Sequence, residues 1–297
     1  MKSKCAEPKP RPYRGRFAPT PSGPLHLGSL VAAVGSYLDA RAHQGCWLVR
    51  IEDIDPPREV SGASAIILRQ LEAHGLYWDE SVRYQSSQTS LYEHNLQRLI
   101  ENDCVYACDC TRRDIKARAP YYTGFCRNRQ LAYTGNALRF VNTDPVLSYS
   151  DLDQGIVTAE PAWAGEDFVL RRRDGLWAYQ LAVVSDDRDQ GITDIVRGQD
   201  LMLPSLWQLS LWQRLNSFAE TCTLPRLRHL PLVTDKQGRK LSKQNYAPAL
   251  DNTCAAQNLS TAMRVLGLPV PTDFEQADIA ALLEWGCAAW KQKIAVQ

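Results

Sequence analysis

The sequence contains no long apolar run and carries almost no net charge. Its longest stretch without Asp, Glu, Lys or Arg, residues 17–38, holds three prolines and a histidine, so it cannot form a continuous membrane-spanning helix. The first twelve residues carry four basic side chains with no apolar segment behind them, which indicates a disordered tail rather than a signal peptide. The formal charge of +1 excludes a cationic field over the whole protein. We expect a cytoplasmic chain without membrane contact.

Disulfide scaffolds, solenoids and disordered proteins are also excluded. Nine cysteines is an odd number and a small share of 297 residues, which favours a reducing compartment. No internal repeat is present. Eight Trp, twelve Tyr and six Phe supply enough apolar surface for a packed interior. The length suits one large domain or two modest ones.

The first third of the chain alternates between strand and helix patterns. Strands are expected at residues 13–18 and 46–51, and helices at 28–43, 60–74 and 88–102. Alternation of this kind predicts an α/β fold with a parallel sheet and crossover helices.

The rest of the chain is less regular. Residues 104–130 form a short, basic segment that contains cysteines and resembles an insertion. Further on we expect strands at 168–172, 176–182 and 229–233, a hairpin turn at 174–175, a loop at 234–246, and helices at 204–215, 255–265 and 276–289.

Positive charge is concentrated in one segment. Residues 111–129 hold six basic side chains against Asp114, which gives that segment +5. The six are Arg112, Arg113, Lys116, Arg118, Arg127 and Arg129. Clusters of this kind bind phosphate backbones, so the segment is the expected contact for a nucleic acid.

A proline-rich loop precedes the first helix. Residues 16–29 contain three prolines and Gly23, so regular structure is expected to begin only at Gly28. A helix N-terminus behind a first strand attracts phosphate, and His26 can donate a hydrogen bond to a phosphate oxygen. The alternative is a proline-rich turn in which the His26 side chain makes its hydrogen bonds within the protein.

Four segments resemble class I aminoacyl-tRNA synthetases. His26-Leu27-Gly28-Ser29 is similar to the His-x-Gly-His signature, with Ser29 in place of the last histidine, as the glutamyl and glutaminyl branch tolerates. Lys240-Leu241-Ser242-Lys243-Gln244 is similar to the second signature, Lys-Met-Ser-Lys-Ser. Residues 50–59 resemble the Arg-Ile-Glu-Asp element of glutamate-specific synthetases, and residues 179–187 with 192–200 resemble the second half of the catalytic domain. The chain is identified as a member of this family over residues 13–246.

The short C-terminal part resembles one subfamily. About fifty residues follow Lys243, as in the truncated paralogues of glutamyl-tRNA synthetase that modify queuosine. The resemblance implies a Rossmann-type parallel sheet with a zinc-bearing insertion and a short helical C-terminal region. The expected division is a disordered tail (1–12), the first half of the catalytic domain (13–103), the zinc-binding insertion (104–135), the second half with the Lys-Leu-Ser-Lys loop (136–246) and a helical end (247–297).

The implied activity is that of a ligase. It would activate L-glutamate with ATP and Mg²⁺ without help from tRNA, and then transfer glutamate to the cyclopentenediol of queuosine at the wobble position of tRNA(Asp). A monomer is expected. Two alternatives stay open: a truncated glutamyl-tRNA synthetase that charges the tRNA 3′ end, and a catalytically silent tRNA-binding paralogue, for which Gln244 is the supporting feature.

The resemblance also implies the roles of individual residues. Arg16 and Arg197 would pair with the glutamate carboxylates, because arginine offers two parallel donors, while Glu52 would hold the ammonium and Tyr179 would donate a hydroxyl hydrogen bond. The expected glutamate-binding residues are Arg16, Phe17, Ala18, Pro19, Thr20, Glu52, Tyr179 and Arg197. The expected ATP-binding residues are His26, Gly28, Lys240 and Lys243, of which His26 and Lys243 are catalytic. The alternative for each arginine is a surface ion pair.

The cysteine cluster predicts a metal site. Cys108, Cys110 and Cys126 offer three thiolates, which leaves one position of a zinc tetrahedron to fill. The subfamily's motif places a tyrosine there, and Tyr122 matches it in Tyr122-Thr123-Gly124-Phe125-Cys126-Arg127. The alternative is three reduced, buried thiols. Trp207, Trp212, Trp285 and Trp290 are either RNA-stacking platforms or core residues.

Overall fold

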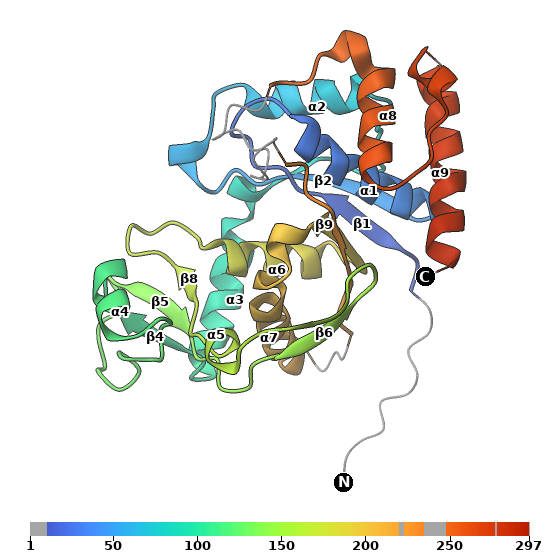
Figure 1. Ribbon diagram of the computed structural model, residues 1–297. Helices are drawn as coiled ribbons and strands as arrows, with labels where there is room; N and C mark the ends of the chain where they lie inside the picture. The colour runs from blue at the N-terminus through green and yellow to red at the C-terminus, as the bar shows by residue number, and fades with distance from the viewer. Residues whose placement is uncertain (1–10, 220–222, 235–247, 277, 297) are drawn as a thin grey trace.

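The computed structural model describes residues 11–219, 223–234, 248–276 and 278–296. The tail expected at residues 1–12 therefore lies almost wholly outside the described residues. Parallel strands flanked by helices form the centre of the fold, as the alternating pattern predicts (Figure 1). In the first sheet, β2 (Cys46–Ile51) pairs in parallel with β1 (Arg14–Phe17) on one side and with β3 (Arg83–Tyr84) on the other.

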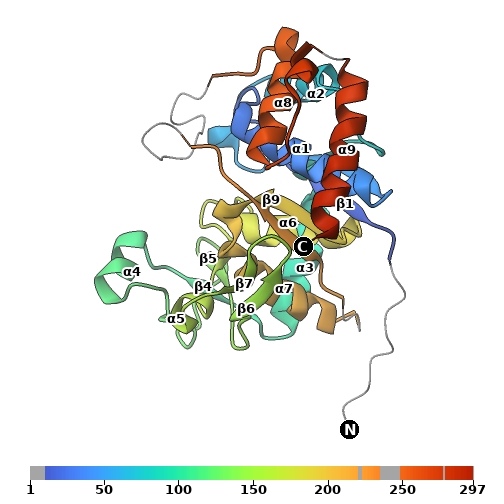
Figure 2. The same ribbon diagram turned by 45° about the vertical axis from the view of Figure 1, so that its right-hand side comes forward.

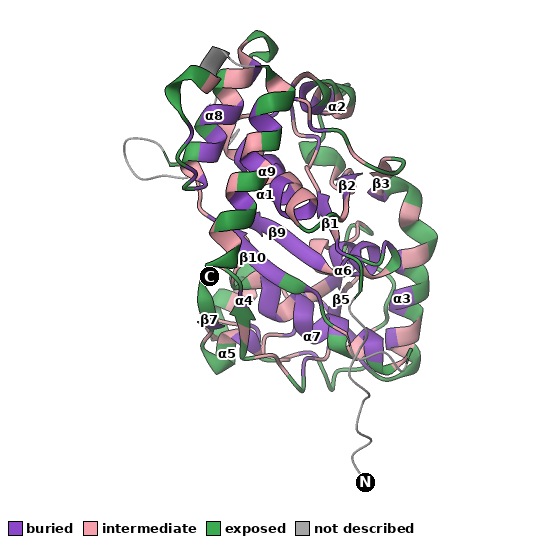
Figure 3. Ribbon diagram, turned by 90° about the vertical axis from the view of Figure 1, so that its right-hand side faces the viewer, coloured by how far each residue is buried: buried purple, intermediate pink, exposed green. Residues whose placement is uncertain are grey.

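A second sheet continues the first. It has the order β7-β6-β10-β9, with β6 (Ser148–Asp151), β7 (Gly155–Thr158), β9 (Asp194–Gly198) and β10 (Arg226–Leu230). β10 runs parallel to both β9 and β6, and both β9 and β10 are largely buried (Figure 3). The Thr193 N–H donates to the Arg14 carbonyl oxygen at 3.0 Å, which places β9 beside β1. The carboxyl ends of β1, β2, β9 and β10 therefore lie along one edge.

Helices cover this central sheet in two groups (Figures 1 and 2). One group contains α1 (Leu27–Ala42), α2 (Ala63–Ala73), α8 (Ala255–Val265) and α9 (Ile279–Ala295). The other contains α3 (Thr89–Glu101), α6 (Tyr179–Asp189) and α7 (Pro204–Ser217). Within the described ranges, no helix is long and apolar enough to cross a lipid bilayer.

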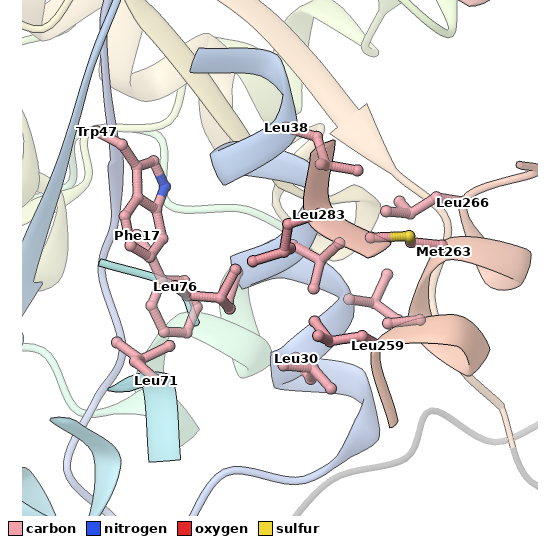
Figure 4. Packing of buried hydrophobic residues seen from close by; sticks show 14 of the residues in the cluster. Phe17, Leu30, Leu38, Trp47, Leu71, Leu76, Leu259, Met263, Leu266 and Leu283 are labelled. Carbon is pink, nitrogen blue, oxygen red and sulfur yellow. The ribbon is translucent and has the colours of Figure 1, made fainter. Parts of the chain in front are cut away.

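The two C-terminal helices are built into the main core. Leu38 of α1 packs in the same cluster as Met263 of α8 and Leu283 of α9 (Figure 4). Full burial of one such side chain stabilises the fold by about 1.5–3 kcal/mol. Trp290 of α9 also donates from its indole N–H to the buried Asp39 carboxylate at 2.9 Å. Residues 248–296 therefore support the sheet that carries the carboxyl edge.

A third, antiparallel sheet lies apart from the other two. It joins β4 (Val105–Cys108), β5 (Ala137–Phe140) and β8 (Val169–Arg171), with α4 (Arg112–Arg118) projecting beyond it and α5 (Pro161–Ala164) nearby (Figure 2). The segment that resembles an insertion thus contributes β4 and α4 to a small layer that β5 and β8, from later in the chain, complete.

Most predicted elements are confirmed, and two are wrong in part. Residues 176–182 form no strand apart from one bridge between Arg171 and Trp177, because α6 begins at Tyr179. Its Leu181–Asp187 stretch is buried throughout, and a short run buried on every side has the same apolar pattern in a helix as in a strand. The strand predicted at 229–233 ends at Leu230, since Pro231 has no N–H to donate to a ladder.

Candidate active site

A cavity of about 590 Å³ opens at the shared carboxyl edge. Open parallel sheets bind ligands at this edge. Many of the predicted substrate-binding residues line the cavity: Arg16, Phe17, Ala18, Pro19, Thr20, His26, Gly28, Tyr179 and Arg197. Glu52 lies next to it, because the Glu52 N–H donates to the Pro19 carbonyl oxygen at 3.0 Å. Residues from distant parts of the chain are therefore brought together.

His26 caps helix α1. Its Nδ1 accepts from the Ser29 N–H at 3.3 Å, and the Ser29 hydroxyl oxygen accepts from the His26 N–H at 2.8 Å. This reciprocal capping box satisfies two N–H groups at the helix start. Since Nδ1 is an acceptor, the proton of the neutral ring lies on Nε2, which makes that nitrogen a donor. Ser29, the departure from the signature, thus orients His26.

Lys240 and Lys243 lie outside the described residues. The chain on either side of their segment reaches the cavity. Leu232 and Val233 line it on the N-terminal side. On the C-terminal side Ala249 forms a bridge with His26, and the Leu250 N–H donates to the Leu25 carbonyl oxygen at 2.9 Å.

Arg16 is held by a buried carboxylate. Its Nε and Nη2 donate to the two oxygens of Asp187 at 2.9 and 3.2 Å, and both side chains are almost fully buried. Arg50 donates to the same Asp187 from Nη1 at 2.7 Å. Burial acts to raise the pKa of Asp187, but the two guanidiniums outweigh it and hold that pKa below its usual range. One edge of Arg16 is therefore occupied, and its other edge is the one that can meet a ligand.

Glu52 completes this buried charge network. Its Oε1 accepts from Arg50 Nη2 at 3.3 Å. Burial raises the pKa of Glu52, and the Arg50 and Arg16 cations oppose the rise without cancelling it. A ligand ammonium beside Glu52 would favour the carboxylate form. The network therefore places an anion next to the cavity that a cationic group can stabilise.

Arg197 is buried among neutral partners. Its Nη2 donates to the Ser205 hydroxyl oxygen at 2.8 Å and to Gln208 Oε1 at 2.6 Å, and its Nε lies 3.4 Å from His229 Nε2. Nη1 has no hydrogen-bond partner, and no carboxylate within the described ranges pairs with this guanidinium. Burial lowers the pKa of Arg197, yet arginine stays charged in proteins. A buried, uncompensated cation lining a cavity is suited to bind an anionic group.

Tyr179 stands at the start of α6 and lines the same cavity. Burial and then the neighbouring Glu52 raise the pKa of its phenol. The hydroxyl therefore keeps its proton at neutral pH and can act as a donor.

The three predicted cysteine ligands converge. The sulfur atoms of Cys108, Cys110 and Cys126 all lie within 4.8 Å of one another. The Tyr122 hydroxyl oxygen accepts from the Cys126 N–H at 3.1 Å, so a fourth donor atom lies at the cluster. Burial and the neighbouring thiols raise the pKa of Cys110 to about 12, and a divalent cation reverses such a shift. The donor set fits a tetrahedral metal ion.

The basic segment is partly neutralised by its own fold. Arg127 pairs with the buried Asp167 at 2.5 Å, and Arg129 pairs with Asp109 at 2.5 Å. Arg112, Arg113 and Lys116 lie on α4, whose residues are exposed or half-buried. The charge available to a nucleic acid is therefore concentrated on α4.

The four tryptophans considered as RNA-stacking platforms, two on α7 and two on α9, contribute to packing. Trp212 and Trp290 are buried in the two main cores. The Trp207 ring stacks on Trp163 with 4.3 Å between ring centroids, and Trp285 packs against Phe274. Their role as core residues is therefore the one that the structure supports.

Several residues around Arg16 and Arg197 were not singled out from the sequence. Asp187 had a detectable signal, because two consecutive aspartates inside a buried apolar helix need cationic partners. Ser205, Gln208 and His229 carried no comparable signal, since single polar residues in a helix or strand usually face solvent or satisfy local backbone groups.

Comparisons with known proteins agree with this geometry. Residues 13–260 match the family model described as tRNA synthetases class I (E and Q), catalytic domain. The chain is 56% identical to the glutamyl-Q tRNA(Asp) synthetase of Idiomarina loihiensis over 95% of this chain and 98% of that protein. It is 49% identical to the enzyme of the same name from Vibrio cholerae, over 95% of this chain and 91% of that one.

Solved structures place the chain in the same fold. The glutamate-tRNA synthetase from Elizabethkingia anophelis is 25% identical with a TM-score of 0.73, over 92% of this chain and 65% of that protein. The chain thus spans about two-thirds of that longer enzyme. A glutamate tRNA ligase from Elizabethkingia meningosepticum, solved in complex with its amino acid, is 26% identical with a TM-score of 0.72, over 92% of this chain and 64% of that one. This chain therefore belongs to the class I tRNA synthetases of the glutamate and glutamine branch, a family of ligases, and within them to the glutamyl-Q tRNA(Asp) synthetases.

Proposed function

We propose that this protein activates L-glutamate with ATP in the absence of tRNA and transfers the glutamyl group to the cyclopentenediol of queuosine at the wobble position of tRNA(Asp). The observation that carries the proposal is Arg197, a buried cation without a carboxylate partner in the described residues, in a cavity that His26 and Gly28 also line. The Idiomarina relative is named glutamyl-Q tRNA(Asp) synthetase and is nearly equal in length to this chain, which supports queuosine in tRNA(Asp) as the acceptor.

The glutamate pocket follows from matching charges. Glutamate carries two carboxylates and one ammonium, so a selective pocket needs fixed cations and a fixed anion. Arg197 and the unoccupied edge of Arg16 would bind the carboxylates, and Glu52 would hold the ammonium. Tyr179 would donate a hydroxyl hydrogen bond. The remaining contacts would come from the chain at Phe17, Ala18, Pro19 and Thr20.

ATP would bind at the start of α1. His26 would donate from Nε2 to a phosphate oxygen, and Gly28 would allow the base to approach the backbone. Lys240 and Lys243, accompanied by Mg²⁺, would neutralise charge on the departing pyrophosphate. The flanks of the lysine segment support this role, because both reach the cavity.

Activation and transfer need no covalent enzyme intermediate. A glutamate carboxylate oxygen attacks the α-phosphorus of ATP, an acyl–phosphate bond forms, and pyrophosphate leaves. A hydroxyl of the cyclopentenediol then attacks the acyl carbon, an ester forms, and AMP leaves. The protein contributes positioning and charge stabilisation in both steps.

The activation step is tested by glutamate-dependent ATP–pyrophosphate exchange without tRNA. We expect exchange with L-glutamate and at least a hundredfold less with L-glutamine, since Arg197 would then face an uncharged amide. Because a site built for charge rejects its neutral isostere, comparable exchange with both amino acids would contradict the assignment of Arg197. Absence of exchange with either would overturn the proposed activation and favour a silent tRNA-binding protein.

We also propose that residues 104–135 form a zinc-bearing insertion and that Cys108, Cys110, Tyr122 and Cys126 hold the metal. A structural zinc ion would cross-link β4 to the loop that follows α4. That loop leads directly from the cationic α4, so the metal would keep α4 in place for contact with tRNA.

Replacing Cys108 by Ser is expected to remove the metal. Elemental analysis should find one zinc ion per wild-type chain and almost none in Cys108→Ser. Cys254→Ser is the matched control, because Cys254 is half-exposed and lies outside the cluster. A chelator should lower the melting temperature of the wild type and of Cys254→Ser but not of Cys108→Ser. Wild-type protein without zinc, or equal zinc in Cys108→Ser, would contradict the site.

A further inference from the structure

The buried His229 connects Arg197 to a carboxylate on a neighbouring strand. His229 lies on β10 with no exposed surface. Its Nδ1 is 2.6 Å from Asp151 Oδ2, and its Nε2 is 3.4 Å from Arg197 Nε and 3.2 Å from the Ser205 hydroxyl oxygen. A chain of contacts therefore runs from β6 through β10 to the guanidinium on β9.

The partners of His229 define where its proton lies. The Asp151 carboxylate can only accept, so Nδ1 must carry a proton and donate to it. The Ser205 hydroxyl is directed at the Leu201 carbonyl oxygen, 2.8 Å away. In the neutral ring, Nε2 is then an acceptor, and it accepts from Arg197 Nε–H. If Nε2 also carried a proton, two N–H donors, those of His229 and Arg197, would face each other, and both side chains would be positively charged.

These contacts orient the Arg197 guanidinium without neutralising its positive charge. The Arg197 side chain touches His229, Ser205 and Gln208, and all three are neutral. A carboxylate in any of these places would compete with an anionic ligand, as Asp187 does on one edge of Arg16. The negative charge of Asp151 is separated from the guanidinium by the imidazole ring.

We propose that His229, held in one tautomer by Asp151, is a positioning residue that fixes Arg197 as the carboxylate receptor for glutamate, and that this receptor weakens when the ring takes up a second proton. The inference rests on the proposed function, since it concerns the same cavity. It adds that glutamate affinity depends on pH through a residue that does not itself line the cavity.

The groups that face His229 favour the neutral ring at neutral pH. Asp151 and Tyr149 face it from β6, Arg197 from β9 and Ser205 from α7, and Asp200 acts on it from the short turn after β9. Burial lowers the pKa of His229, Arg197 lowers it further, and Asp151 opposes both without reversing the direction. The ring is therefore neutral at neutral pH.

Two amide variants test the contacts of the two ring nitrogens separately. In His229→Asn the amide reaches the place of Nδ1, so the contact with Asp151 is kept and the contact with Arg197 is lost. In His229→Gln the amide reaches the place of Nε2, where its oxygen can accept from Arg197 and cannot be protonated. At pH 7.5 we expect the KM for glutamate in pyrophosphate exchange to rise about ten- to a hundredfold in His229→Asn and to change less than about threefold in His229→Gln. The KM for ATP should stay the same in both.

The pH profile is the readout that a merely structural role would not change. Between pH 7.5 and 5.5 the glutamate carboxylates remain ionised, so the wild-type KM for glutamate should rise as the pH falls toward the lowered pKa of His229. The rise should be smaller in His229→Gln, where only groups such as Glu52, whose pKa is raised by burial, still take up a proton. His74→Gln is the control, because His74 is equally buried but lies away from Arg197, and it should keep the wild-type slope.

The possible failures are distinguishable. A wild type without glutamate-dependent exchange would overturn the proposed function and this inference with it. If exchange occurs but His229→Gln keeps the acid dependence of the wild type, or His229→Asn leaves the KM for glutamate unchanged, the positioning role of His229 is overturned while the proposed function stands. Should His229→Asn fail to fold, the comparison of wild type with His229→Gln still decides the question.

Discussion

Replacing Arg197 by Gln is expected to lower kcat/KM for glutamate at least a hundredfold while the protein stays folded. Loss of one partner from a desolvated charge pair costs about 2–5 kcal/mol, and every 1.4 kcal/mol corresponds to a factor of ten. The existing partners of Arg197 are neutral, so its removal leaves no buried carboxylate without a counter-charge. Exchange kinetics at saturating ATP, with calorimetric titration of glutamate, measure the effect.

Arg226→Gln is the matched control for this variant. Arg226 lies on β10 next to β9, but its side chain is more than half exposed, pairs with Asp194 and lines a different cavity. It should leave kcat/KM for glutamate within about twofold of the wild type, since Arg226 does not line the cavity that holds Arg197. Equal losses in the two variants would show that the effect of Arg197→Gln is not specific to the cavity.

Replacing Asp187 by Asn is expected to lower the free energy of unfolding by about 3–5 kcal/mol, because it leaves two buried guanidiniums short of a counter-charge. Arg16 and Arg50 both donate to Asp187, and all three side chains are buried. Asp189→Asn is the control: Asp189 is two residues away, 45% exposed and paired with Arg83, so its loss should cost less than about 1 kcal/mol. Urea unfolding compares the variants, and equal costs would contradict a central role for Asp187.

The pH dependence of the Asp187 effect has a definite sign. The pKa of this carboxyl is lowered in the folded state by Arg16 and Arg50, against the effect of burial. Its stabilisation is therefore fully present above the unfolded pKa of about 3.9 and is lost as the pH falls through the lower folded value. The difference in stability between wild type and Asp187→Asn should hold from pH 7 to about pH 4 and shrink below it. A difference that grows on acidification would contradict this account.

Local patterns in the sequence were enough to predict the strands and helices at the start of the chain. β2 has the predicted bounds, and so does α8 near the end of the chain. The resemblance to the synthetase family supplied the residues expected at the site, and many of them line one cavity, because loops after parallel strands meet at one edge of a sheet. The position of His26 at the N-terminus of α1 follows from the same reasoning.

Long-range charge compensation could not be predicted from local pattern. Nothing near Arg16 in the sequence indicates that Asp187, 171 residues away, occupies one of its edges. In the same way, the sequence counts Arg127 among the cations of the basic segment, although Asp167, 40 residues away, pairs with it. The helix α6 was taken partly for a strand because an apolar run buried on every side has no periodicity to distinguish the two.

The central claim is tested most directly by transfer of labelled glutamate to purified tRNAs. The account predicts transfer to tRNA(Asp) that carries queuosine, none to the same tRNA with unmodified guanosine at the wobble position, and none to tRNA(Glu). A label that is released from the queuosine tRNA when the nucleoside is removed would place the ester on the base. Transfer to tRNA(Glu), independent of queuosine, would contradict the account and indicate a truncated glutamyl-tRNA synthetase that charges the 3′ end.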